Sequence, residues 1–117
     1  MRIEIKGRNT SVTDEQRALI EKRFRKVAAQ VSDLARLEVE LSEERNPAIR
    51  DGCVAEATLW LKGVTLRASG ASPEMSHSII VCSDQLARQV KRHRAKRRKR
   101  REGRGQADYG GDAAAAI

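Results

Sequence analysis

Aromatic side chains are scarce in this chain of 117 residues, which has one Phe, one Trp and one Tyr. This scarcity argues against proteins that bind single-stranded nucleic acid by stacking bases on rows of aromatic rings. No apolar run approaches the length that crosses a bilayer, and the N-terminal MRIEIKGRN lacks the apolar core of a secretory signal. We therefore expect a cytoplasmic protein with no membrane partner.

Residue types that bind metals or perform catalysis are also few. The two cysteines, Cys53 and Cys82, lie 29 residues apart without a CxxC motif, and the only histidines are His77 and His93. Isolated cysteines of this kind are typical of reduced thiols rather than of a metal site. No nucleophile or carboxylate pair is placed by sequence beside either histidine. We expect no metal, no cofactor and no enzymatic activity.

Positive charge is plentiful, and it is concentrated near one end of the chain. The formal net charge is +8, and residues 88–104, RQVKRHRAKRRKRREGR, hold eleven of the twenty-four basic residues against one acid, Glu102. The rest of the chain holds thirteen basic and fifteen acidic residues, a net charge of −2. A field that dense attracts a polyanion and concentrates it at one place. The charge makes RNA, DNA or an anionic membrane surface the first candidates, ahead of a small substrate, and of these a nucleic acid is the partner that we expect.

Hydrophobic periodicity predicts six elements in the order β-α-β-β-β-α. Residues that alternate between apolar and polar predict strands over 2–6, 36–41, 55–62 and 64–68, of which the last three form an antiparallel meander. A capping box of Thr13 and Gln16 predicts the start of a first helix, which ends at Ser32-Asp33. The second helix opens at Ser72-Pro73-Glu74.

The second helix is predicted to be longer than the sheet that it covers. Its buried stripe is Met75, Ile79, Cys82 or Ser83, Leu86, Val90 and His93. A strand of eight residues spans ~26 Å and about eighteen helical residues span the same distance, so the helix should leave the sheet near Arg92. We predict an α+β domain over 1–101, with both helices on one face of a four-stranded sheet, and a disordered tail or interdomain linker over 102–117.

The two predicted helices each carry basic residues opposite their apolar stripe. If the helices pack side by side, these residues form one continuous basic surface, which suits RNA because phosphate contacts dominate affinity. The run of six basic residues at 96–101 is typical of an interaction arm. For Lys22 and Lys26 alone, a merely solvated helix face stays open as the alternative. The other sheet face, with Glu38, Glu40 and Glu56 beside Trp60, is expected to be acidic and to repel RNA.

Three segments resemble the ribosome hibernation promoting factors, also called ribosome-associated inhibitors. The opening IEIKGRNTSVTDEQRALIEKRFRKV is similar to the family's first strand, GRN-like turn and basic first helix. ATLWLKGVTLRASGASPEMSHSI resembles its strand–Gly–strand hairpin and the start of its last helix, and DQLARQVKRHRAKRRK resembles the end of that helix. Together these segments cover residues 2 to about 100 in the family's order.

The resemblance implies a non-enzymatic protein that binds the small ribosomal subunit between head and body. Family members occupy the path of mRNA and tRNA there and keep ribosomes idle in stressed or stationary-phase cells. The rRNA contacts would fall on Lys22, Arg23, Lys26, Arg88, Lys91, Arg92 and Arg94, followed by Lys96, Arg97 and Arg98 of the arm.

The chain also departs from the family pattern. Ser76 and Ile80 stand where Tyr and Asp are usual, and Gln85 replaces a common Lys, so contacts made by those residues are in doubt. Long family members add a second domain that pairs two ribosomes. We expect the chain to be either a short form or the N-terminal part of a long form, and the ending AAAAI favours the N-terminal part of a long form. Two other hypotheses stay open: a generic double-stranded RNA-binding domain, and a protein-interaction module with a basic arm.

Overall fold

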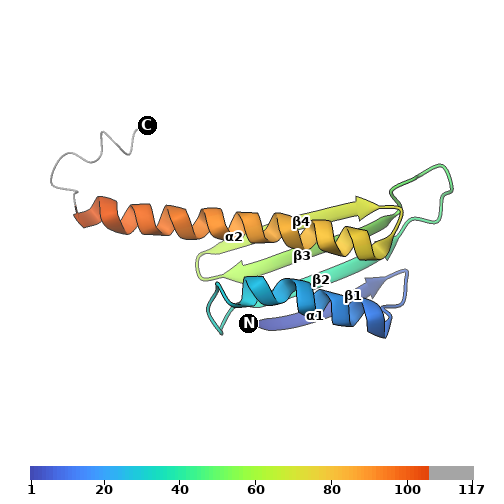
Figure 1. The fold of residues 1–117 in the computed structure, drawn as a ribbon, viewed down its shortest axis with the longest axis horizontal. Coiled ribbons are helices and arrows are strands. Elements are labelled where there is room, and N and C mark those ends of the chain that lie inside the picture. Colours follow the sequence, from blue (N-terminus) through green and yellow to red (C-terminus); the bar gives the residue numbers. More distant parts are fainter. Residues whose placement is uncertain (106–117) are drawn as a thin grey trace.

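The computed structural model describes residues 1–105, with side chains up to residue 100. Six elements follow one another in the predicted order (Figure 1). They are β1 (Arg2–Arg8), α1 (Asp14–Ala28), β2 (Arg36–Glu43), β3 (Cys53–Leu61), β4 (Val64–Ser72) and α2 (Met75–Gly105). The α+β fold class predicted from periodicity is confirmed.

The four strands form one sheet in the order β1-β2-β3-β4. β1 pairs with β2 in parallel, because α1 returns the chain to the same end of the sheet before β2 begins. β3 pairs in antiparallel with β2 on one side and with β4 on the other, which confirms the predicted meander. The turn between β3 and β4 contains Gly63 at φ 80°, a left-handed conformation that glycine adopts without steric cost.

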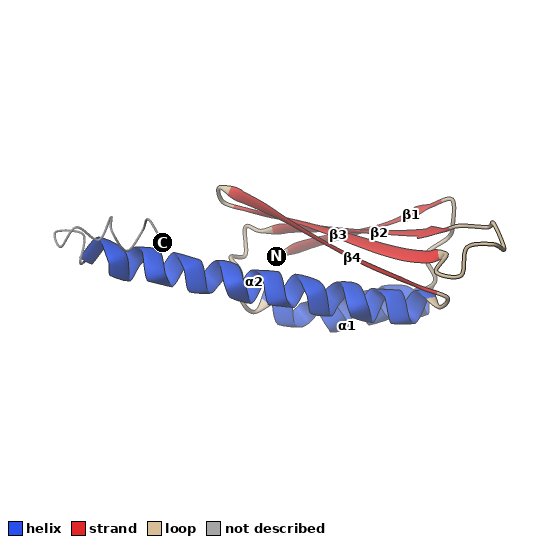
Figure 2. Ribbon diagram, turned by 90° about the horizontal axis from the view of Figure 1, so that it is seen from above, coloured by secondary structure: helices blue, strands red, loops and turns tan. Residues whose placement is uncertain are grey.

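Both helices lie on the same face of the sheet, and Figure 2 shows this face from the side. Residues of alternate position on the strands meet apolar residues of the helices in one continuous core. Its fully buried large side chains include Phe24 and Ile20 of α1, Leu37 and Leu59 of the sheet, and Leu86 of α2. The core therefore sets the rotation of each helix about its axis and thus the residues that each helix presents to solvent.

The first helix is shorter than predicted. It begins as expected, because the Thr13 side chain accepts the Gln16 backbone N–H and the Gln16 side chain accepts the Thr13 N–H, each at 3.1 Å. It ends at Ala28 rather than at Ser32-Asp33, because the Gln30 N–H turns to the Val27 carbonyl, three residues back. The chain then needs residues 29–35 to turn into β2, and Val31 packs against the core from this loop.

The second helix continues past the sheet (Figures 1 and 2). Its 31 residues span about 46 Å, whereas the nine residues of β3 span about 30 Å. Its last buried residue among those described is Val90, close to the predicted departure near Arg92. The helix runs on to Gly105, four residues into the segment predicted as a tail, because Lys and Arg are good helix formers that extend a helix already anchored. The rest of that predicted tail, 106–117, lies outside the described residues.

Candidate nucleic-acid interface

The first helix presents basic side chains on the side away from its buried residues. Ile20, Phe24 and Val27 are fully buried, and the residues between them, Lys22 and Lys26, are exposed. Arg23 is half-buried, since it flanks Phe24 rather than lying opposite to it. The predicted placement of this basic set on the outer side of α1 is therefore confirmed for the two lysines and holds in part for Arg23.

The second helix carries the larger part of the basic surface. Leu86 and Val90 are buried, and helix geometry turns Arg88 and Arg92 away from them. Every predicted contact residue of this helix is exposed: Arg88, Lys91, Arg92, Arg94, Lys96, Arg97 and Arg98. All of these except Arg88 lie beyond Val90, the last buried residue, but Arg94 still contacts the domain through its hydrogen bond to Gln30, and Lys96 and the residues after it follow that contact.

The two helices lie side by side and are joined by a polar contact (Figure 1). The Arg94 guanidinium Nη1 donates to the Gln30 side-chain oxygen at 3.5 Å, and the Gln30 amide nitrogen donates to the Lys26 carbonyl at 3.3 Å. Gln30 therefore connects the end of α1 to α2 and makes the two basic sets neighbours. The sequence analysis missed Gln30, because a polar residue just after a helix carries no signal of a contact 64 positions away.

A cleft opens where α2 leaves the domain. It has a volume of about 740 Å³ and lies between α2, the loop after α1 and the turn between β3 and β4. Val31, Leu61 and Val90 supply apolar surface, and Lys62, His93 and Arg97 are among its polar lining residues. The sequence analysis did not place Lys62 at the basic surface, since only the tertiary structure brings the β3–β4 turn close to the helix.

The cations of both helices lack acidic partners among the side chains that the structure describes. Ion pairs in residues 1–100 join Arg2 to Glu4 at 3.8 Å and Lys6 to Glu38 at 3.6 Å, and all four residues belong to β1 and β2. Cations without nearby carboxylates keep their full field for an external anion. The basic surface is thus electrostatically available, and its charge is largely solvated rather than neutralised within the domain.

The sheet face opposite the helices is not acidic as predicted. The alternation of the strands places four carboxylates on it, from Glu4, Glu38, Glu40 and Glu56. The same face carries five cations, from Arg2, Lys6, Arg8, Arg36 and Arg67, which offset these carboxylates. The prediction considered the acids of two strands and did not include the bases that the register brings beside them. The Arg36 guanidinium lies 4.2 Å from the centre of the Trp60 ring, a cation–π contact on this face.

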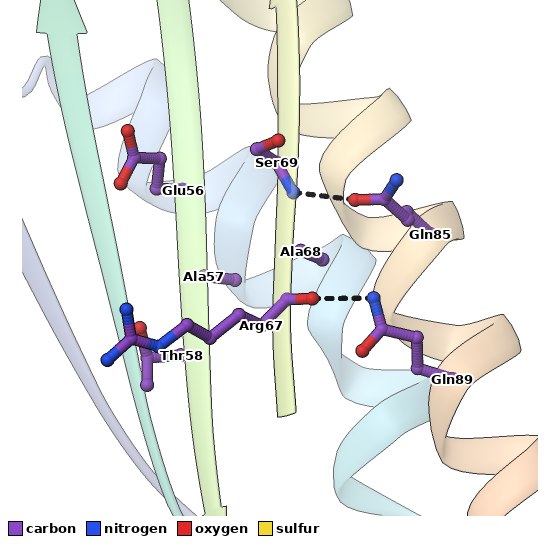
Figure 3. A pocket seen from close by; sticks show the side chains of 8 residues that line it. All are labelled: Glu56, Ala57, Thr58, Arg67, Ala68, Ser69, Gln85 and Gln89. Carbon is purple, nitrogen blue, oxygen red and sulfur yellow. Dashed lines mark hydrogen bonds between the residues drawn. The ribbon is translucent and has the colours of Figure 1, made fainter. Parts of the chain in front are cut away.

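A second hollow lies between α2 and β4, and Figure 3 shows the residues that line it. The Gln85 side-chain oxygen accepts the Ser69 backbone N–H at 2.7 Å, and the Gln89 amide nitrogen donates to the Arg67 carbonyl at 2.5 Å. These glutamines satisfy backbone groups on the edge strand of the sheet, which otherwise stay open for pairing. The lysine that the resemblance led us to expect at position 85 could not make this contact, because an ammonium group cannot accept the Ser69 N–H.

The thiols are not activated for chemistry. Burial raises the pKa of Cys82 to about 12, assisted by the charge of Glu56. Burial also raises the pKa of Cys53, with the charges of Glu43 and Glu74 acting in the same direction. Since the thiolate is the reactive form, both residues are poor nucleophiles. Within residues 1–100, no group of three or more His, Cys, Asp or Glu could hold a metal ion.

The other sequence departures lie on different sides of α2. Ser76 is exposed and Ile80 is half-buried, so Ser76 lies on the solvent side and Ile80 at the flank of the packed stripe. His77 is exposed, and His93 is half-buried in the cleft wall.

None of the helices in the part of the chain described is long and apolar enough to cross a membrane.

A family model for the Sigma 54 modulation protein / S30EA ribosomal protein family matches residues 3–98, which is most of the chain. The chain belongs to this family. The resemblance to hibernation factors is likewise confirmed, since the chain is 31% identical over 97 residues to a ribosome hibernation promotion factor of Picosynechococcus sp., covering 82% of this chain and 50% of the relative. It is 30% identical over 107 residues to the factor of Staphylococcus aureus, covering 90% and 54%. The chain thus spans about half the length of these two relatives.

Shorter relatives and solved structures match over nearly their full length. The ribosome hibernation promoting factor of Acinetobacter guillouiae is 28% identical over 99 residues, covering 80% of this chain and 88% of the relative. The N-terminal domain of Protein Y from Thermus thermophilus superposes with a TM-score of 0.68 at 26% identity, covering 80% of this chain and 99% of that domain. A ribosomal subunit interface protein from Coxiella burnetii superposes with a TM-score of 0.69 at 18% identity, covering 81% and 99%, and supports the fold alone.

Proposed function

We propose that this chain is a ribosome hibernation factor that binds the small ribosomal subunit through rRNA. In this proposal it occupies the channel of mRNA and tRNA and inhibits translation by idle ribosomes. The observation that carries the proposal is the unneutralised basic surface formed jointly by α1 and α2 in a member of this family. Its mechanism is electrostatic docking followed by steric exclusion, which needs no catalytic group.

The test is a charge reversal at the centre of the basic surface. We expect Lys91→Glu with Arg92→Glu to abolish co-sedimentation with purified small subunits, because both side chains are exposed, Arg92 on the outer side of α2 and Lys91 at the edge of the cleft. The control is Arg45→Glu with Arg50→Glu, which makes the same charge change in the exposed loop between β2 and β3, at the opposite end of the sheet (Figure 1). Unchanged binding of the first variant would refute the proposal, and circular dichroism checks that both variants fold.

The location on the subunit is tested by competition. If the protein fills the decoding channel, mRNA together with initiator tRNA should displace it from small subunits, and it should inhibit translation in a reconstituted system. Simultaneous binding of all three components would mean that the protein docks elsewhere. This outcome would agree with the proposed ribosome binding but would refute the proposed steric mechanism.

The two parts of the basic segment should have different roles. Residues up to Arg94 are held by the packed part of the domain, so we expect Arg88→Ala with Arg92→Ala to change the footprint on rRNA. Lys96 and Arg98 lie past Arg94, whose bond to Gln30 is the last side-chain hydrogen bond from α2 to the rest of the domain in residues 1–100, so their alanine variants should weaken binding and flatten its salt dependence without moving the footprint. Hydroxyl-radical footprinting over a salt series separates these results. Identical effects of both pairs would contradict the division.

The two other hypotheses predict different partners. A generic double-stranded RNA-binding domain would bind any RNA duplex as tightly as it binds small subunits, whereas a hibernation factor should prefer the subunit strongly. A protein-interaction module would keep its partner in lysate treated with nuclease. The basic surface and the family favour the ribosome, and direct comparison of these three preparations decides between them.

A further inference from the structure

The side of α2 that faces the sheet, called its underside below, changes from apolar to basic where the helix extends past the sheet. Arg97 follows Val90 by seven residues, two helical turns, so it lies on the side that faces the core in the packed part of the helix. Val90 is fully buried and Arg97 is exposed. His93, one turn after Val90, is half-buried on the same side. The helix thus places a cation where continued packing would require an apolar residue.

This underside forms the roof of the cleft described above. Its cations come from two elements: α2 supplies Lys91, Arg94, Arg97 and Arg98, and the turn between β3 and β4 supplies Lys62. Among residues 1–100, neither Asp nor Glu lines it, and no carboxylate lies within 4.0 Å of these five cations. The rim on the α1 side is held in place by the contact of Arg94 with Gln30. A concave site with one sign of charge from separate elements has the form of an anion-binding cleft.

The size and composition of the cleft indicate which polyanion it fits. Its volume of about 740 Å³ lies in the range of sites that enclose small ligands, so a short stretch of a single strand fits and an RNA duplex does not. Val31 and Leu61 leave partly exposed apolar surface on its floor, against which a ribose or base can pack. Among the described residues, no Phe, Tyr or Trp lines it, so bases would stack on arginine planes or on the imidazole of His93, without sequence preference.

We propose that this cleft binds an unpaired segment of RNA through its phosphates, on the side of α2 opposite to Arg88 and Arg92. The end of the helix would then be held between two RNA segments, one against its outer side and one beneath it. This inference rests on the proposed function, because rRNA supplies both segments. It adds a second contact site, with Lys62 and Arg97 as its phosphate-binding residues.

Crosslinking from each side of the helix tests this arrangement. The photoreactive residue benzoylphenylalanine is placed at position 62, in the cleft, or at position 92, on the outer side, and each protein is irradiated while bound to small subunits. Both positions are exposed, so neither replacement disturbs the core. We expect both to crosslink to rRNA at nucleotides that are not adjacent in sequence.

The outcomes separate the two proposals. Crosslinks to rRNA from position 92, with crosslinks from position 62 to a ribosomal protein or to nothing, would overturn the cleft proposal and leave the proposed function standing. Crosslinks to the same nucleotides from both positions would also overturn it. Absence of rRNA crosslinks from both positions would refute the proposed function together with the cleft.

The salt dependence of binding gives a second measure. Each phosphate contact to a single strand contributes about 0.7 to the slope of log K against log salt, so Lys62→Ala with Arg97→Ala should lower the slope by about 1.4. Between 50 and 200 mM salt, the original chain should then lose about sevenfold more affinity than this variant. Arg45→Ala with Arg50→Ala removes the same charge at the far end of the sheet and should leave the slope unchanged. Equal slopes for the cleft and loop variants would overturn the proposal.

Discussion

Replacing Gly70 by alanine should destabilise the domain by forcing α2 away from the sheet. Gly70 is buried in β4, and a Cβ atom there would lie 2.3 Å from the Ser78 carbonyl oxygen and 2.9 Å from the Cys82 nitrogen. Both atoms belong to the backbone of α2, so no side-chain rotation relieves the overlap. Real Cβ atoms essentially never approach heavy atoms below 3.0 Å, so the two elements must separate by about 0.7 Å (3.0 − 2.3).

The structure allows this cost to be estimated. A gap of this size forfeits roughly a quarter of the dispersion energy of a packed side chain, which for one large residue such as Ile79 amounts to about 2 kcal/mol. Ser78 also lies in a buried hydrogen-bond network, in which its hydroxyl donates to the Cys53 carbonyl at 2.6 Å. We therefore expect a loss of about 3 kcal/mol in the free energy of unfolding, at the upper end for overpacked cores.

Urea unfolding, followed by circular dichroism, measures this loss. The matched control is Gly63→Ala, at a position with no heavy atom within 4 Å and a φ of +80°. There the cost is conformational alone, about 1 kcal/mol. A stability of Gly70→Ala within about 0.5 kcal/mol of the original chain, or no lower than that of Gly63→Ala, would refute the steric reasoning.

Four further predictions concern the cap, the thiols and the edge strand. Thr13→Ala should lower the free energy of unfolding by about 1 kcal/mol, measured in urea, because it removes the acceptor of an N-cap hydrogen bond; an unchanged value would mean that water replaces the cap. Alkylation at alkaline pH should label Cys53 well before Cys82, whose pKa is raised from 9.0 to about 12; equal rates would contradict its burial. Because that pKa is higher in the folded state, its contribution to stability is complete below about pH 9 and is lost as the pH rises toward 12, which unfolding over a pH series can measure. Gln85→Lys should speed hydrogen exchange at the Ser69 amide and cost about 1 kcal/mol, whereas Gln85→Glu, which keeps an acceptor, should have a smaller effect; similar exchange in both variants would show that the hydrogen bond is unimportant.

Several features of the fold could be predicted from the sequence because they depend on short-range patterns. Alternation of apolar and polar residues located the strands. The spacing of Leu19 or Ile20, Phe24, Val27 and Val31 predicted the buried side of the first helix, and the structure buries Ile20, Phe24 and Val27. The capping box of Thr13 and Gln16 is local chemistry that occurs in the structure as predicted. The end of α1 could not be predicted, because the chain leaves the helix where β2 must begin rather than where the apolar spacing stops.

The candidate interface was predictable in its residues and not in its arrangement. Helix periodicity alone placed Arg88, Lys91 and Arg92 on the solvent side, since rotation by 100° per residue is a property of the backbone. The contribution of Lys62 could not be foreseen, because it depends on a turn that reaches α2 only after β3 and β4 have paired. The charge balance of the outer sheet face was missed for the same reason, since strand register brings cations of β1 and β4 beside the carboxylates of β2 and β3.

The sequence by itself determined the order of elements, the side of each helix that is buried and the concentration of positive charge near one end, because each depends on neighbours a few positions apart. Only the tertiary structure decided how that charge is used. The packing of α1 beside α2 joins two basic sets through Gln30 and Arg94, and the finite length of the sheet leaves the end of α2 uncovered. The cleft lies beneath that end because a helix of 31 residues is longer than strands of nine residues. This difference in length has a consequence only when helix and strands pack on the same core.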